Sequence, residues 1–150
     1  MRTSEALLHL VTAPRSARPA KAPAPEAISG SRLIELRPHS LAWSAIANFS
    51  ARLGIEPASL LRVIGISERT AIRRRAEGYL KPEEADRLLR VGRIFEEATR
   101  ILGNEERAAG WLSDPSPVFH NQPPLTFLDS DAGAHEVILE LLRIDYGVFA

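Results

Sequence analysis

The stretch PASLLRVIGISERTAIRRRAEG, residues 57–78, predicts two short helices joined by a tight turn. Pro57 suits the first turn of a helix, where a missing backbone N–H costs no hydrogen bond. Gly65 permits a sharp turn, and Ser67 can cap the second helix by accepting a hydrogen bond from its first turn. Gly78 can end that helix. Two short helices with this spacing are typical of a helix-turn-helix motif, in which the second helix faces outward.

The second helix of the motif, residues 68–77, is rich in arginine. Arg69 and Arg73 are four residues apart, as are Thr70 and Arg74, so the two members of each pair lie on one side of the helix. We therefore expect these four side chains on a broad outward face.

Contact with duplex DNA is the function that we expect of this face. Arg69 or Arg73 could donate two hydrogen bonds to O6 and N7 of guanine in the major groove. Thr70, Arg74 and Arg75 are expected to hold phosphates. The candidate DNA-binding residues are Ser67, Glu68, Arg69, Thr70, Arg73, Arg74 and Arg75.

A helix face that contacts only water is the alternative explanation of this charge run. The turn, the serine cap and a net charge of +3 over residues 66–81 together favour DNA binding. Ala71 and Ala76, together with Ile72, are expected to form the inward side of the helix.

The overall composition indicates a folded protein. The chain has 150 residues, of which 45% are hydrophobic and 25% charged, as in ordinary globular domains. This length suggests one compact domain or two very small ones. Because the chain has no cysteine, it cannot form a disulfide, a cysteine-ligated zinc site or a thiol nucleophile. No apolar run approaches the roughly 20 residues that a membrane span requires, so we expect a soluble protein.

The charges are distributed unevenly although they sum to zero. Residues 1–61 carry a net charge of +3 and residues 62–93 carry +4, whereas residues 94–150 carry −7. A basic middle and an acidic end suggest two surfaces for two different partners. Of the 19 basic residues 17 are arginine, which favours paired hydrogen bonds to phosphate or guanine.

Helical patterns and helix caps cover most of the chain beyond residue 38. Ser40 can cap the first of these helices, and Pro82 can open a long one. The expected helices span residues 40–53, 57–64, 68–77, 82–102, 104–112 and 131–146. Because no alternating strand pattern of useful length is present, we predict an all-α fold.

The N-terminal part differs from the rest in composition. Residues 12–30 are rich in alanine and contain four prolines, which predicts an extended linker, and residues 4–11 are compatible with one short helix. Residues 1–25 contain arginine and a single acidic residue, Glu5, which is also the composition of an organellar transit peptide. We nevertheless favour a cytoplasmic protein with a loose tail. The expected division is a flexible tail over 1–31, a helix-turn-helix domain over 32–80 and a second helical domain over 81–150.

The chain carries no motif typical of an enzyme, so we expect no catalysis, no cofactor and no metal ion. The four histidines lack the spacing of metal ligands. Glu83–Glu84 and Glu96–Glu97 are adjacent pairs, whose side chains point about 100° apart on a helix. The first pair is explained by its place at a helix N-terminus, and Trp111 is expected to anchor the core.

The last residues, IDYGVFA, are unusually apolar for a chain end. Val148 and Phe149 could fold back onto the last helix. Alternatively, the segment could insert into another protein. The local sequence leaves both explanations open.

Three segments of the sequence resemble the Xre/MbcA/ParS-type antitoxins. They are IGISERTAIRRR (residues 64–75), LKPEEADRLLRVGRIFEEATRILGNEERAAGWL (80–112) and PLTFLDSDAGAHEVILELLRIDYGVFA (124–150). The most specific positions are Leu80, Pro82, Asp86, Arg87, Leu88, Trp111, Leu112, Pro124, Leu125, Leu128, Tyr146 and Gly147. The resemblance covers about residues 32–150 and leaves only the N-terminal tail outside it.

The resemblance implies a type II antitoxin that represses its own operon through the helix-turn-helix. The C-terminal domain would bind and neutralise a cognate toxin, typically a RES-type, NAD-consuming enzyme, by covering its active site. Members of this group are generally homodimers. The residues implied at the toxin interface are Asp145, Tyr146, Gly147, Val148, Phe149 and Ala150.

Two other functions remain open from the sequence. One is a stand-alone dimeric helix-turn-helix repressor without a toxin partner. The other is an interaction adaptor that does not bind DNA, which the charge of −7 over residues 94–150 would suit.

Overall fold

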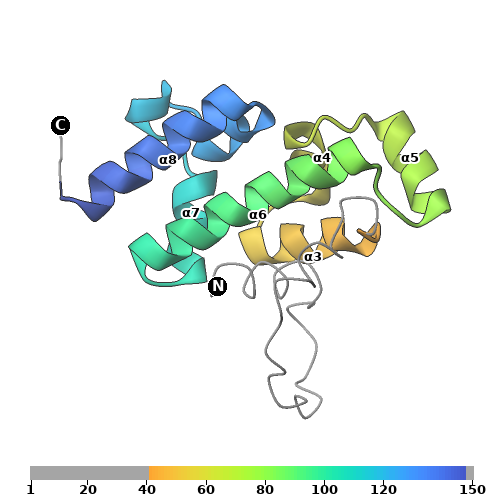
Figure 1. The fold of residues 1–150 in the computed structure, drawn as a ribbon, viewed down its shortest axis with the longest axis horizontal. Helices are drawn as coiled ribbons and strands as arrows, with labels where there is room; N and C mark the ends of the chain where they lie inside the picture. The colour runs from red at the N-terminus through yellow and green to blue at the C-terminus, as the bar shows by residue number, and fades with distance from the viewer. Residues whose placement is uncertain (1–40, 148–150) are drawn as a thin grey trace, which may run out of the picture.

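The computed structural model describes residues 41–147, and the expected N-terminal tail, the expected cap at Ser40 and the residues Val148–Ala150 lie outside this range. The described residues form helices and no β-strand, which confirms the predicted all-α fold (Figure 1). The elements in chain order are α3 (Ser44–Leu53), α4 (Pro57–Val63), α5 (Glu68–Glu77), α6 (Pro82–Leu102), α7 (Glu105–Ser113), the 3₁₀ helices η2 (Pro117–Phe119) and η3 (Pro124–Asp129), and α8 (Asp131–Asp145). None of the helices among these residues is long and apolar enough to cross a membrane.

The long helix α6 runs through the middle of the molecule, with α5 near its N-terminal end and the end of α8 near its C-terminal end (Figure 1). Its 21 residues begin at Pro82 and end before Gly103, whose φ of 98° terminates the helix. Leu88, Val91 and Phe95 recur at helical spacing and are at most 1% exposed. The α6 helix therefore presents an apolar face that both halves of the chain can cover.

One hydrophobic core joins the two halves of the molecule. It extends from Phe49 and Leu53 in α3, through α6, to Val137 and Leu141 in α8. Trp111 packs edge-on against Phe119, with ring centroids 6.2 Å apart, and thus lies against the core as predicted. Because the core is continuous from Leu41 to Leu141, it holds the two halves of the described range together.

Most helix boundaries are where local sequence places them. Pro57 and Pro82 open α4 and α6, and Ser67 caps α5. We expected the first helix to begin at Ser40, whereas α3 begins at Ser44. The backbone before α3 instead pairs with the segment after α5, where the N–H of Leu80 donates to the carbonyl of Leu41 at 3.0 Å.

Candidate functional sites

The turn between α4 and α5 is held against α6. Gly65 adopts a left-handed backbone with φ of 70°, as the predicted turn requires. Arg87 of α6 donates from Nη1 to the carbonyl of Ile64 at 3.1 Å. A Cβ on Gly65 would lie 2.9 Å from the same Nη1 atom, so the close approach of Arg87 also favours glycine.

The cap of α5 uses the serine that the sequence predicts. Ser67 Oγ accepts a hydrogen bond from the backbone N–H of Thr70 at 3.3 Å and donates to Thr70 Oγ1 at 3.1 Å. The cap therefore engages both Ser67 and Thr70, two of the candidate DNA-binding residues, in the first turn of the helix.

The predicted outward position of Arg74 is wrong. Its side chain is 3% exposed, and its Nε donates to both carboxylate oxygens of Glu84 in α6, at 3.0 and 2.9 Å. Its Nη1 donates to Glu77 at 2.7 Å. These bonds, that to Glu84 above all, raise the pKa of the Arg74 guanidinium, which therefore remains charged. Arg74 fastens α5 to α6 and is not free to hold a phosphate.

The sequence analysis missed Glu84 as the partner of Arg74, because it assigned the pair Glu83–Glu84 to the helix dipole alone. Glu84 also accepts a hydrogen bond from the backbone N–H of Lys81 at 2.9 Å, which is half of a capping box. The three-residue spacing between Lys81 and Glu84 could have indicated the cap. No local pattern indicates that Arg74, ten residues earlier, completes the carboxylate's bonding.

The predicted inward side of α5 is only partly correct. Ala71 is buried as expected, whereas Ile72 is 73% exposed and Ala76 is exposed. Ala71 and Arg74 are three residues apart and together form the buried side of α5, from which Arg74 reaches Glu84 of α6. Ile72 and Ala76 therefore lie on the outer side, where the sequence analysis had placed Arg74.

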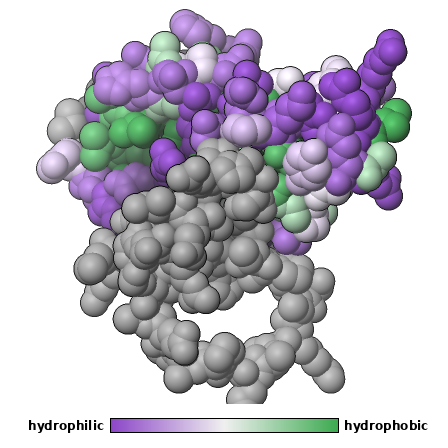
Figure 2. Space-filling view, turned by 45° about the vertical axis from the view of Figure 1, so that its right-hand side comes forward, coloured by the Kyte–Doolittle hydropathy of each residue, from purple (hydrophilic) through white to green (hydrophobic). Residues whose placement is uncertain are grey.

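The remaining candidate residues of α5 reach solvent. Glu68, Arg69, Arg73 and Arg75 are exposed, and Thr70 is partly buried. No side-chain hydrogen bond or ion pair joins Arg69, Arg73 or Arg75 to another residue of the described range 41–147. Figure 2 shows mostly hydrophilic side chains at this end of the molecule, with a small apolar spot among them. The outer side of α5 thus offers guanidinium groups that are available to a partner.

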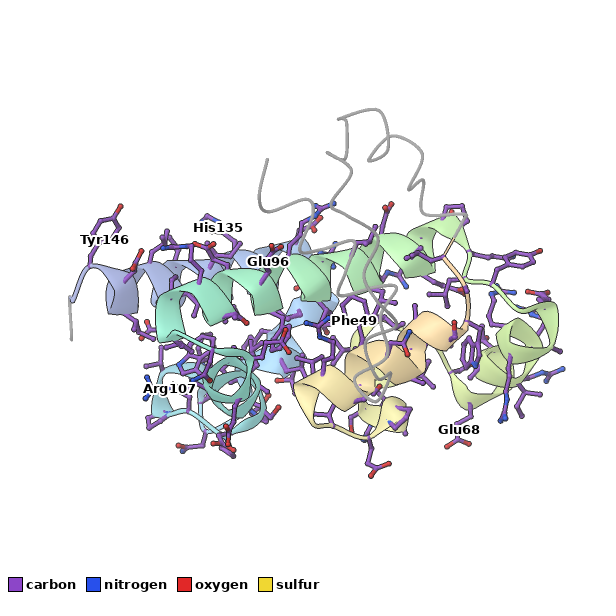
Figure 3. All side chains as sticks on the ribbon, turned by 90° about the horizontal axis from the view of Figure 1, so that it is seen from below. Phe49, Glu68, Glu96, Arg107, His135 and Tyr146 are labelled. Carbon is purple, nitrogen blue, oxygen red and sulfur yellow. The ribbon has the colours of Figure 1, made fainter. Side chains whose placement is uncertain are left out.

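The end of α8 lies far from α5, as the labelled Tyr146 and Glu68 at opposite ends of Figure 3 make clear. Tyr146 is 78% exposed, and Gly147 turns the chain with φ of 67°. Asp145 accepts from Arg100 of α6 at 3.0 Å, and Arg100 also pairs with Glu97 at 2.7 Å.

Arg100, which the sequence analysis did not single out, ties the last turn of α8 to α6. Its hydrogen bonds to Glu97 and then Asp145 raise the pKa of its guanidinium. Of the six candidate toxin-interface residues, Asp145 is thus already paired within the chain, Tyr146 and Gly147 are exposed, and Val148–Ala150 lie outside the described residues.

Together, the all-helical architecture, the capped turn and the exposed arginines of α5 define a helix-turn-helix protein. Residues 32–93 match the family described as the antitoxin Xre-like helix-turn-helix domain. Residues 97–147 match the antitoxin Xre/MbcA/ParS C-terminal toxin-binding domain. The chain thus carries the two domains of the Xre/MbcA/ParS antitoxins one after the other. The two matched ranges adjoin within α6, which contributes to both.

Two curated relatives carry the same name. The chain is 34% identical over 98 residues to "Antitoxin Xre" of Yersinia enterocolitica, an alignment that covers 64% of this chain and 66% of the relative. It is 30% identical over 91 residues to "Antitoxin Xre" of Photorhabdus laumondii, covering 59% of this chain and 62% of the relative. The chain thus spans just under two thirds of the length of these relatives.

Proposed function

We propose that this protein is the antitoxin of a type II toxin–antitoxin system, a non-enzymatic regulator that neutralises a toxin and represses its own operon. The observation that carries the proposal is the succession of the two matched domains in one chain. The outer side of α5 and the exposed end of α8 supply two separate surfaces, one for each activity.

The DNA-binding activity is assigned to α5. Its outer side would enter the major groove, where Arg69 and Arg73 can donate to guanine and Arg75 can contact phosphate. The protein would bind as a homodimer, with two α5 helices about 34 Å apart, so that the operator contains inverted half-sites roughly one helical turn apart or a multiple of it. Binding of this kind weakens as the salt concentration rises.

The toxin-binding activity is assigned to the end of α8 and the residues that follow it. We propose that the partner is a RES-type, NAD-consuming toxin and that Asp145–Ala150 cover the entrance to its active site. An enzyme that binds an anionic dinucleotide needs a positively charged pocket, which the net charge of −7 over residues 94–150 would complement. Tyr146, exposed at the tip, would supply a large apolar contact at the centre of the interface.

Co-expression with the product of the neighbouring gene tests both activities at once. The expected result is that growth is restored, that the two proteins co-purify, and that the purified protein shifts DNA from upstream of its own operon. DNA binding without rescue of growth would instead identify a stand-alone repressor. Rescue without any DNA binding would leave the antitoxin assignment and refute the repressor.

A further inference from the structure

The outer side of α5 combines charged and apolar side chains at one helical spacing. One face of α5 carries four side chains, each of which lies three or four residues along the helix from two of the others. They are Arg69, Ile72, Arg73 and Ala76. This face is opposite the buried side of α5, which Ala71 and Arg74 form. It is therefore the face that α5 offers to whatever binds it.

Ile72 is the unusual member of this face. It is 73% exposed, although single exposed apolar residues are common and by themselves mean little. Ile72 lies next to Arg73 and one helical turn from Arg69, and neither guanidinium group is bonded to another residue within 41–147. A protein partner would need a contiguous apolar patch, whereas one isoleucine between two unpaired guanidinium groups offers none.

The major groove of DNA offers the matching combination. Guanine presents two acceptors to arginine, and thymine presents an apolar C5-methyl group at the same depth. A β-branched side chain has essentially one rotamer in a helix, so Ile72 is already ordered before it binds. The hydrogen bonds of Arg74 to Glu84 of α6 hold the rotation of α5 about its axis and therefore keep Ile72 pointing outward.

We propose that Ile72 is a specificity-determining residue that packs on the C5-methyl group of a thymine beside the guanines read by Arg69 and Arg73. This inference rests on the proposed DNA binding by α5 and adds a base preference to it. The site should then contain a thymine next to a guanine in each half-site. Loss of the methyl group should weaken binding by about fourfold, the factor expected for one buried methyl-sized group.

The test begins with selection of binding sites from random 30-base-pair duplexes by the full chain. Each thymine of the selected site is then replaced by deoxyuridine, which removes the methyl group and leaves every hydrogen-bonding atom in place. Affinities are measured by fluorescence anisotropy at one fixed salt concentration. The variants are Ile72→Ala and Ile72→Val, with Val118→Ala as the matched control, since Val118 is 54% exposed at a distance from α5 in the chain.

The proposal expects one thymine per half-site whose replacement weakens wild-type binding about fourfold. Ile72→Ala should bind the thymine and deoxyuridine probes equally, Ile72→Val should retain most of the preference, and Val118→Ala should behave as wild type. A selected site that the wild type binds equally well with and without every methyl group refutes the role of Ile72 but leaves DNA binding intact. If no sequence is enriched at all, both this inference and the DNA-binding part of the proposed function are wrong.

Discussion

Helices α5 and α8 begin in the same way and are held in place differently. Each starts after a serine cap followed by an acidic residue, Ser67 before Glu68 and Ser130 before Asp131. Yet α5 buries only Ala71 and Arg74, whereas α8 buries Ala134, Val137 and Leu141.

The difference shows how two helices that share one hydrophobic core can serve different surfaces. Because α5 is fastened to α6 by the ion pair Arg74–Glu84 and buries only Ala71 and Arg74, most of its circumference remains available to a partner. The α8 helix packs along most of its length, and Arg100 also holds its last residue, Asp145, whereas the next residue, Tyr146, is largely exposed. The predictions below separate these two arrangements, from the largest expected effect to the smallest.

Deletion of residues 146–150 should abolish neutralisation of the co-expressed toxin, because it removes the exposed tip of α8 and leaves the buried face of that helix intact. DNA binding should not change. Growth of cells that express both proteins measures the first effect, and fluorescence anisotropy measures the second. Full protection by the truncated chain would show that the toxin binds elsewhere on the C-terminal domain.

Gly133→Ala should lower the free energy of unfolding by about 2–3 kcal/mol, because the added Cβ would lie 2.0 Å from the carbonyl oxygen of Phe127, a backbone atom that cannot easily move. Gly110→Ala in α7 is the matched control. Its Cβ would meet nothing nearer than 4.0 Å, so that variant should be as stable as the wild type or up to about 1 kcal/mol more stable. Urea denaturation distinguishes them, and equal stabilities would contradict the packing of α8 on η3.

Arg73→Ala and Arg74→Ala should have opposite consequences although the two residues are adjacent. Loss of exposed Arg73 should weaken DNA binding by about 10- to 100-fold and leave the unfolding temperature unchanged. Loss of buried Arg74 leaves Glu84 without its partner and should lower the unfolding temperature by about 5 °C or more. Thermal unfolding followed by circular dichroism measures the unfolding temperature of both variants. An unaltered melting curve for Arg74→Ala would refute the structural role of Arg74.

Ser67→Ala and Ser130→Ala should each lower the free energy of unfolding by about 1 kcal/mol. Each substitution removes the acceptor for a backbone N–H in the first turn of its helix. The losses should differ in their functional effect. The Ser67 variant should weaken DNA binding and retain neutralisation, whereas the Ser130 variant should do the reverse. Identical defects in both assays would mean that the two helices do not act separately.

Local sequence was sufficient for much of the fold. Helix starts at Pro57, Ser67 and Pro82 and the turn at Gly65 were predicted correctly, because caps, fixed proline torsions and positive-φ glycines act over a few residues. The start of α3 was not predicted, since its position depends on backbone pairing with Leu80, a residue far along the chain.

The sequence by itself determined most of the helices, the helix-turn-helix spacing and the resemblance to the two antitoxin domains. Only the tertiary structure decided which side of α5 is buried, because that choice depends on Glu84 of the next helix. A carboxylate that α6 brings against α5 draws Arg74 inward, and the rotation that results turns Ile72 outward between Arg69 and Arg73. An ion pair between two helices outweighed the ordinary preference of an isoleucine for the interior.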